Sequence, residues 1–310
     1  MRGKVMNLYL GIDGGGTKTK VSIIDESENL IFENTSGPSS IDTVSNEETY
    51  KAFKEAIDPF IAKNRNTKIK GVFAGLGGIV FEKDYELVSN IIRLLPGIDK
   101  NTFVMARNDM ENALYSSNHF DSGMALICGT GMVAFGKNNG LTHKCGGWGF
   151  REGELGSAYH LGVEAIRHSI RAYDSRYKMD DFAKDVANSL NLKVASDIIK
   201  IMNEIQGNRT FIASLAPIVT KHANKGNIYA KQIIDLATDE LILAIQGVYN
   251  KLNFKKTTLV IIGSLGNSKG YFSDSLKTKL KETNPNIKLV KAVFDPSLAA
   301  AIAAKRFFKE

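Results

Sequence analysis

The part of this sequence best suited to chemistry is a strand that runs into an acid, three glycines and a threonine. Residues 8–12 are apolar and end at Asp13, and a second apolar run, 21–24, follows the glycines directly. This spacing predicts a β-hairpin with a glycine turn. Adjacent glycines let backbone N–H groups approach a phosphate chain, because no Cβ stands in the way. The predicted phosphate-binding residues are Gly14, Gly15, Gly16, Thr17 and Lys18.

Asp13 closes the first strand, where a carboxylate could hold a hydrated Mg²⁺ beside the phosphates. Two common phosphate loops do not fit. The pattern GxxxxGK[ST] is absent, and the dinucleotide-binding pattern needs a helix where residues 21–25 alternate like a strand. For this segment alone, a tight hairpin that binds nothing is the alternative.

The composition indicates a soluble globular protein. The chain has 310 residues, of which 43% are hydrophobic and 24% charged, enough for one large domain or two ordinary ones. No apolar run reaches the length of a membrane span, and we find no signal-peptide segment, so no membrane partner is expected. Cys128 and Cys145 cannot make a disulfide framework, which favours the cytoplasm.

The net charge of +7 is spread along the chain, with lysines mixed among acids and asparagines. This distribution indicates a solvated surface with a mild attraction for anionic ligands such as nucleotides. Basic and aromatic residues do not alternate in any segment, so no nucleic-acid partner is expected.

The order of the predicted elements shows that the opening pattern repeats. Strands are expected at 5–12, 19–25, 28–35, 69–75, 101–106, 123–128, 132–136, 141–144, 259–262 and 287–290. Helices are expected at 47–62, 83–95, 108–115, 154–171, 178–190, 194–205, 209–223, 227–252 and 296–308. Residues 129–131 form a second glycine and threonine turn between strands, about one domain after the first. Two such hairpins predict two α/β lobes that clamp one nucleotide in the cleft between them.

Five segments in a fixed order, four of them glycine-rich, give the chain a resemblance to known proteins. They are residues 11–19, 74–78, 108–113, 128–131 and 145–159, the last with a CGGWG…GSAY pattern, and residues 262–266 match more loosely. The chain resembles the actin-like ATPase fold of hexokinase, Hsp70 and actin. Within that fold, it is similar to the family that groups N-acetylglucosamine kinases with BadF/BadG-type ATPases.

The resemblance implies an α/β fold of two actin-like, ribonuclease-H-like lobes with a nucleotide and sugar cleft between them. The N-terminal lobe would span 1–117 and regain the closing helix 296–310, and the C-terminal lobe would span 118–295 with helical insertions. The lobes would close around ATP and sugar and exclude water. A homodimer is common among similar kinases, and the sequence leaves the oligomeric state open.

The resemblance also implies an ATP site with Mg²⁺ near Asp13. The second phosphate loop would be Gly129, Thr130 and Gly131. Gly263 and Ser264 would lie beside the adenosine, with Ala213 near the base. Asp109 would be the catalytic base that accepts the proton of the acceptor hydroxyl. Its alternative role is an ordinary helix N-cap.

On the sugar side, the resemblance implies a set of binding residues drawn from several loops. They are Ser39, Ser40, Gly77, Gly78, Asn108, Asp109, Cys145, Gly146, Gly147 and Glu154. Glu154 and Leu155 replace acids of the family pattern, and Ile41 stands where related kinases carry an asparagine, so the sugar is less firmly assigned than the fold. Trp148 could stack on a sugar, although we expect it to anchor its loop in the core.

The resulting hypothesis is an ATP-dependent kinase that phosphorylates O6 of an N-acetylated amino sugar, N-acetylglucosamine or N-acetylmuramic acid. A lactyl carboxylate on the sugar could meet Lys144 or Arg151. The alternatives are a broader hexokinase or glucokinase and an iron–sulfur ATPase activator of CoA-ester reductases or dehydratases, which would need thiolate ligands. A zinc-binding member of the repressor-open-reading-frame-kinase family is rejected, because Cys145 has only His143 nearby. A nucleotide switch like Hsp70 ranks last.

Overall fold

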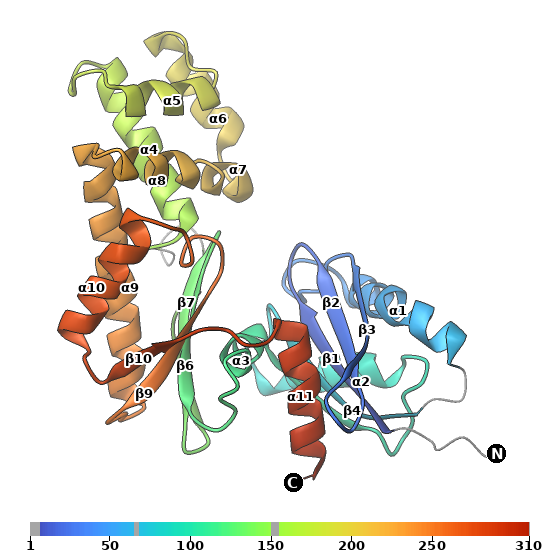
Figure 1. The fold of residues 1–310 in the computed structure, drawn as a ribbon. Coiled ribbons are helices and arrows are strands. Elements are labelled where there is room, and N and C mark those ends of the chain that lie inside the picture. Colours follow the sequence, from blue (N-terminus) through green and yellow to red (C-terminus); the bar gives the residue numbers. More distant parts are fainter. Residues whose placement is uncertain (1–6, 65–67, 150–154, 310) are drawn as a thin grey trace. The chain divides into compact units, whose positions relative to one another are not determined.

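The computed structural model describes residues 7–64, 68–149 and 155–309, and the chain folds into two compact units (Figure 1). Unit 1 takes Met1–Phe120 together with Ala292–Glu310, and unit 2 takes Asp121–Lys291. The chain therefore leaves unit 1, builds the whole of unit 2, and returns to finish unit 1.

Unit 1 is built on a mixed five-stranded sheet with the order β3-β2-β1-β4-β5. Its strands are β1 (Asn7–Gly14), β2 (Thr19–Ile24), β3 (Leu30–Ser36), β4 (Lys68–Leu76) and β5 (Phe103–Asn108). The first three strands form an antiparallel meander, and β1, β4 and β5 run parallel. Parallel strands end at the same edge of a sheet, so Asp13, Gly75 and the loops after them gather at one edge.

Four helices cover this sheet. They are α1 (Asn46–Lys63), α2 (Glu82–Arg93), α3 (Asp109–Tyr115) and α11 (Pro296–Lys309). A capping box starts α1: the Ser45 hydroxyl accepts from the Glu48 N–H, and the Glu48 carboxylate accepts from the Ser45 N–H. The C-terminal helix α11 packs against β1, β2 and β4, so the last residues of the chain complete the core of the first sheet.

Unit 2 repeats this plan with a sheet of order β10-β9-β6-β7-β8. Its strands are β6 (Gly123–Cys128), β7 (Met132–Asn138), β8 (Leu141–Gly146), β9 (Thr257–Ile262) and β10 (Ile287–Val290). Again a three-strand antiparallel meander is joined to parallel strands, which is the arrangement of unit 1. The repeated hairpin that the sequence predicted is thus matched by a repeated sheet.

The helices of unit 2 include an insertion beyond one end of its sheet (Figure 1). They are α4 (Ala158–Tyr173), α5 (Asp181–Ser189), the 3₁₀ helix η1 (Ala195–Asp197), α6 (Ile198–Ile205), α7 (Arg209–Ala213), α8 (Ala216–Asn224), α9 (Ile228–Lys251) and α10 (Tyr271–Thr283). Figure 1 shows α4 to α8 stacked past the sheet, with α9 and α10 alongside it. No helix in the described ranges is long and apolar enough to cross a membrane.

Two parts of unit 2 differ from the sequence prediction. The single helix expected over 209–223 is divided into α7 and α8, because Pro217 stands in the first turn of α8 and cannot supply the N–H that a continuous helix needs. The helix α10 was not predicted. Its buried apolar residues Phe272, Leu276 and Leu280 recur every four positions. The residues between them are mostly polar or charged, so the helical period is weak in the sequence.

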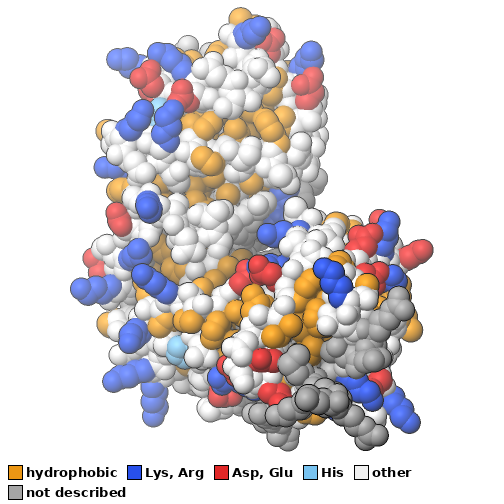
Figure 2. Space-filling view, turned by 45° about the vertical axis from the view of Figure 1, so that its right-hand side comes forward, with side chains coloured by type: hydrophobic (Ala, Val, Ile, Leu, Met, Phe, Trp, Pro, Cys, Tyr) orange, Lys and Arg blue, Asp and Glu red, His pale blue; other side chains and the backbone are white. Residues whose placement is uncertain are grey.

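Charged side chains are distributed over the surface, as Figure 2 shows for one face. Lys and Arg lie scattered among Asp and Glu on that face, with hydrophobic side chains exposed between them. Among the large apolar side chains described in unit 2, Ile199 and Ile228 are highly exposed.

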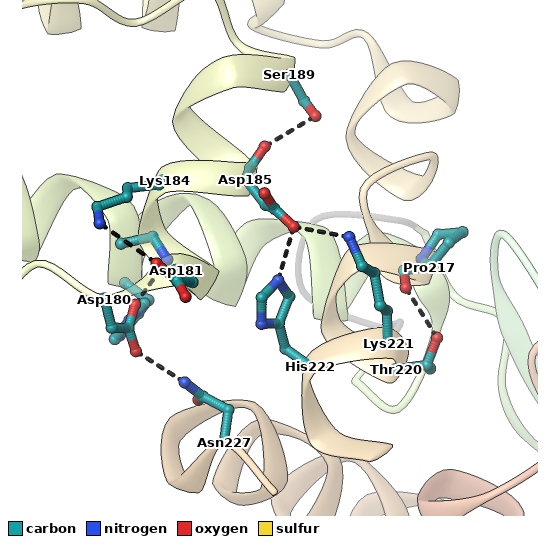
Figure 3. A network of polar contacts seen from close by, with 12 residues as sticks. Asp180, Asp181, Lys184, Asp185, Ser189, Pro217, Thr220, Lys221, His222 and Asn227 are labelled. Atoms are coloured by element: carbon teal, nitrogen blue, oxygen red, sulfur yellow. Dashed lines mark hydrogen bonds and ion pairs between the residues drawn. The ribbon is translucent and has the colours of Figure 1, made fainter. Parts of the chain in front are cut away.

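A polar network, of which the His222 ring is buried, joins the helices of the insertion (Figure 3). The Asp185 carboxylate on α5 accepts from His222 Nε2 at 2.8 Å and from Lys221 Nζ at 2.9 Å, both on α8. Asp180, before α5, accepts from Asn227 Nδ2 at 2.8 Å, ahead of α9. His222 is 5% exposed, so its ring depends on Asp185 for a partner.

We expect Asp185→Asn to destabilise unit 2 by about 1 kcal/mol at pH 7, because the buried His222 loses a charged partner, while solvent screens the exposed pair of Asp185 with Lys221. Hydrogen bonds from Lys221 and then His222 lower the pKa of Asp185 to about 2. A lowered pKa stabilises the fold above the ordinary value of 3.8 and loses its effect as the pH falls toward 2. The difference between variant and wild type should therefore shrink below pH 4 in urea-unfolding curves followed by circular dichroism.

The matched control is Asp181→Asn on the same helix, whose carboxylate is exposed and pairs only with the exposed Lys184 in Figure 3. It should change stability little. Equal losses in the two variants would contradict a special role for the Asp185 network.

Candidate functional site

The predicted phosphate hairpin of unit 1 is a tight turn between β1 and β2. The Gly15 N–H donates to the Lys18 carbonyl at 3.0 Å, and Gly16, Thr17 and Lys18 are exposed. The Gly15 carbonyl in turn accepts from the N–H groups of Ser39 and Ser40. These hydrogen bonds from Ser39 and Ser40 hold the turn in place, and its exposed backbone can face a ligand.

The predicted sugar-side loops of unit 1 lie against this hairpin. The Gly77 N–H donates to the Gly14 carbonyl at 2.9 Å, which joins the end of β4 to the end of β1. A Cβ at Gly77 would meet the Ser40 hydroxyl at 2.5 Å and the Asp109 carboxylate at 3.8 Å. Gly78 has φ +81° and leaves room for Asp42. The structure thus places Ser40, Gly77 and Asp109 side by side.

Asp13 lies half-buried at the end of β1, beside other carboxylates. Its Oδ1 accepts from Asn112 Nδ2 at 2.8 Å. Burial raises the pKa of Asp13 to about 7, against the lowering effect of the Asn112 hydrogen bond, and the charges of Asp109 and Asp295 raise it further. A bound cation would relieve this repulsion, because it favours the ionised form.

Asn108 and Asp109 mark the start of α3, and their roles differ. The Asn108 side chain caps the helix, since its Oδ1 accepts from the Met110 N–H at 3.0 Å, and its Nδ2 donates to the Ile79 carbonyl at 2.7 Å. Asp109 is the first residue inside the helix. The N-cap role that was the alternative for Asp109 therefore belongs to Asn108.

The oxygen atoms around Asp13 suit a hydrated Mg²⁺. The carboxylate of Asp13 is a hard ligand, and Asn112 Oδ1 is buried with no hydrogen-bond partner among the residues that the structure describes. No group of three or more His, Cys, Asp or Glu in the described ranges could enclose a metal ion. Mg²⁺ that binds through one carboxylate, waters and substrate phosphates needs no such enclosure.

The second predicted phosphate loop, in unit 2, is held by the start of α4. The Gly129 N–H donates to the Gly131 carbonyl at 2.9 Å and closes the turn. The carbonyls of Gly129 and Thr130 accept from the N–H groups of Ala158 and Tyr159. The hairpin is therefore bonded to the first turn of the helix behind it.

The predicted adenosine loop adjoins this hairpin. The Gly266 N–H donates to the Cys128 carbonyl at 3.0 Å, and Gly263, at φ +104°, packs its Cα against the same carbonyl. Ser264, which follows, is exposed, and Ala213 is buried at the end of α7. The structure thus joins Gly263 to the phosphate hairpin.

A cavity of about 560 Å³ opens within unit 2 between α4, α6 and α7. Its wall runs from Tyr159, next to the phosphate hairpin, to Ile212, next to Ala213. Apolar side chains dominate the wall, with the amides of Asn203 and Gln206 among them. Ligand pockets usually have this volume and composition.

The predicted sugar loop of unit 2 begins at the end of β8. Cys145 packs its Sγ against Gly247 on α9, and Gly146 and Gly147 follow in positive-φ conformations. Trp148 is 69% exposed, with Lys144 Nζ at 3.8 Å from its ring centroid. The prediction that Trp148 anchors the loop in the core is wrong. The glycines on either side turn the indole outward, where it makes a cation–π contact. Glu154 and Arg151 lie outside the described residues.

Sequence reasoning missed two residues of this site. Asn112 contacts Asp13, and the only signal was its position three residues after Asp109, on the same helix face. Asp295 accepts from the Ser297 N–H and hydroxyl at the start of α11 and pairs with Lys20 at 3.3 Å. Its proximity to Asp13 depends on the return of the chain to unit 1, which local sequence does not reveal.

Comparison with known proteins gives matches along almost the whole chain. The model of the BadF/BadG/BcrA/BcrD ATPase family matches residues 10–305. An N-acetylmuramic acid/N-acetylglucosamine kinase of Clostridium acetobutylicum is 29% identical over 305 residues, covering 97% of this chain and 99% of the relative. An N-acetyl-D-glucosamine kinase of Dictyostelium discoideum is 30% identical over 313 residues, covering 96% and 97%.

The fold is also that of solved structures. A putative N-acetylglucosamine kinase from Chromobacterium violaceum superposes with a TM-score of 0.75 at 18% identity, covering 96% of this chain and 99% of that one. The predicted fold class is confirmed: each unit is a mixed five-stranded sheet with helices, of the actin-like ATPase type.

We expect Asp13→Asn to stabilise the protein in the absence of nucleotide and metal. A folded-state pKa near 7, above the ordinary 3.8, means that stability is full below pH 3.8 and is lost as the pH rises through 7. The variant should melt a few degrees higher than wild type at pH 8, with less difference at pH 5. Asp25→Asn is the control, and it should lower the melting temperature at pH 8 instead of raising it. The reason is that a hydrogen bond from Asn29 lowers the pKa of Asp25, so the ionised form of Asp25 stabilises the fold. A lower melting temperature for Asp13→Asn at pH 8 would refute the conclusion that the ionised Asp13 carboxylate destabilises the free protein.

Trp148 gives an optical test of the sugar loop, because it is the only tryptophan in the chain. Its exposure predicts red-shifted emission that acrylamide quenches readily. Lys144→Met should change the emission intensity, because it removes the ammonium from the ring. Blue-shifted emission that resists quenching would show that the indole is buried.

Proposed function

The chain belongs to the BadF/BadG/BcrA/BcrD ATPase family, and we propose from this premise that it is an ATP-dependent sugar kinase. The observation that carries the proposal is the cluster in unit 1. There, backbone hydrogen bonds join Gly77 to Gly14 and join Ser39 and Ser40 to Gly15. The Asp109 carboxylate lies beside Gly77. A phosphate hairpin, candidate hydroxyl ligands and a carboxylate meet at one sheet edge, as phosphoryl transfer to a sugar requires.

In this proposal, ATP uses both glycine hairpins. The hairpin Gly14–Lys18, which is exposed at residues 16–18, and the turn Gly129–Gly131 would hold the phosphates, because N–H groups without neighbouring Cβ atoms can approach them closely. Gly263 and Ser264 lie by the adenosine. The cavity that runs from Tyr159 to Ile212 joins the phosphate hairpin to the neighbourhood of Ala213 and supports a base site there.

Asp13 and Asn112 would hold the hydrated Mg²⁺ that accompanies ATP. The ion, when bound, neutralises charge on the β- and γ-phosphates during transfer. Asp13 would serve this role with a carboxylate at the strand end that the bound cation would keep ionised, and the Asn112 amide fixes one of its oxygens.

Asp109 is the proposed base. It accepts a hydrogen bond from the O6 hydroxyl of the sugar and takes its proton as the O6–P bond forms and the bond from the γ-phosphorus to the ADP oxygen breaks. The proton ends on the Asp109 carboxylate, and ADP leaves with the electron pair. Because Asn108 caps the helix, the Asp109 carboxylate is not required for that purpose.

The proposed substrate is an N-acetylated amino sugar, either N-acetylglucosamine or N-acetylmuramic acid. Both curated relatives are named as kinases of such sugars and align over nearly their whole length. Ser39, Ser40, Gly77, Gly78 and Asn108 would supply polar contacts from unit 1. Cys145, Gly146, Gly147 and Glu154 would supply those from unit 2.

An iron–sulfur ATPase activator is the second candidate, and the cysteines disfavour it. Cys128 is fully buried in a strand, and burial raises the pKa of its thiol to about 12. A cluster between subunits needs accessible thiolates.

The test is a coupled ADP-release assay with Mg·ATP and a panel of sugars: glucose, glucosamine, N-acetylglucosamine, N-acetylmannosamine and N-acetylmuramic acid, with a control lacking sugar. We expect turnover with an acetamido sugar and little without it. Equal turnover on glucose would favour a broad hexokinase. ADP release that no sugar changes would contradict the kinase and favour the activator.

Asp109→Asn should lower kcat by about 10²-fold or more, with nucleotide affinity nearly unchanged. Asp84→Asn is the matched control, because Asp84 also stands at a helix start of unit 1, where it accepts from the Val80 and Phe81 N–H groups. The control should retain kcat. Full turnover in Asp109→Asn would remove Asp109 from the role of base.

A further inference from the structure

The buried side chain of Asn112 contacts the candidate metal carboxylate, Asp13. It lies three residues after Asp109 on α3, so the two side chains share one face of the helix. Asn112 is fully buried. Its Nδ2 donates to Asp13 Oδ1 at 2.8 Å and to the Ile12 carbonyl at 3.1 Å. Because acceptors surround this end of the amide, the donor nitrogen must face Asp13.

A glycine in the sheet, Gly75, leaves space for the Asn112 amide. Gly75 on β4 is the parallel neighbour of Asp13 on β1. A Cβ at Gly75 would overlap the Asn112 amide group, its Oδ1 lying at only 2.5 Å. The missing side chain at position 75 is therefore what allows Asn112 to reach Asp13.

The other end of the amide points to a ligand. Asn112 Oδ1 is buried and has no hydrogen-bond partner in the described structure. Buried polar atoms are nearly always paired, and an exception in a native protein calls for a water, an ion or a role in function. The water molecules that Mg²⁺ retains when it binds are donors and can pair with this oxygen.

We propose that Asn112 is the positioning residue for the magnesium site: its Nδ2 fixes the Asp13 carboxylate, and its Oδ1 accepts from a water bound to the ion. This inference rests on the proposed function, because Mg²⁺ enters through ATP. One helix then carries both the base, Asp109, and the group that orients the metal carboxylate. Movement of α3 would shift the acceptor hydroxyl and the metal together.

The test compares the binding of ADP with and without Mg²⁺ by calorimetry, which needs no turnover. In Asn112→Leu, of similar size without the hydrogen bonds, the gain in ADP affinity that Mg²⁺ confers should fall by about 10–100-fold. The affinity for metal-free ADP should stay within about twofold of wild type. In the kinase assay, the Mg²⁺ concentration for half-maximal rate should rise, while the KM for the sugar stays unchanged.

Two further variants keep the test decisive if Asn112→Leu folds poorly. Gly75→Ala displaces the amide from Asp13 without altering it and should give the same Mg²⁺-specific loss. Asn112→Ser retains a hydroxyl donor and should recover part of the loss. The matched control is Asn34→Leu on β3, in another part of the sheet, where the Asn34 Nδ2 donates to the Ala56 carbonyl. It should lower the melting temperature and leave the Mg²⁺ effect intact.

The outcomes separate this inference from the proposed function. Equal weakening of ADP with and without Mg²⁺ in all the variants would mean that Asn112 is merely structural, and would overturn the inference while sugar phosphorylation by wild type still stands. A wild-type protein that binds ADP equally with and without Mg²⁺ would also overturn it. Absence of sugar phosphorylation by wild type, together with Mg²⁺-dependent ADP binding that the variants lose, would overturn the kinase alone.

Discussion

The close packing of α11 on the first sheet is the constraint on which unit 1 depends. A Cβ at Gly11 would overlap backbone atoms of Ser297 and Ala301, and one at Gly71 would lie 2.9 Å from the Ala304 carbonyl. The alanines of α11 that face the sheet are fully buried. Helix and sheet can approach this closely only because both surfaces lack bulk, and the many short contacts then add up to a large packing energy.

This packing determines the chemistry at the end of β1. It brings Asp295, at the start of α11, near Asp13, while α3 brings Asp109 from another part of the chain. Burial, and then the nearby charges of Asp109 and Asp295, make an ionised Asp13 carboxylate costly in the free protein, and the raised pKa of Asp13 expresses that cost. Sites that bind cations and phosphates accept such strain, because the ligand relieves it.

In unit 2, as in unit 1, glycines allow close packing of neighbouring segments. Gly263 and Gly266 pack against Cys128, and Gly247 leaves room for Cys145. In both units, a hairpin turn is held from behind by a neighbouring loop or helix through backbone hydrogen bonds. Glycines are a regular feature of the candidate site because several of them leave room for a neighbouring group: Gly263 admits the Cys128 backbone, and Gly75 admits the Asn112 side chain.

The sequence by itself determined the strands, most helices, the repeated hairpins and the family, because alternation, helical period and glycine turns are local patterns. It named Asp13 and Asp109 from their places after strands. Tertiary structure alone decided that Asn112 reaches Asp13, that Asp295 lies near Asp13, and that Trp148 is exposed. These depend on backbones that meet across the fold, such as Gly75 beneath Asn112 and α11 on β1, and no local pattern records which distant segment fills the space above a glycine.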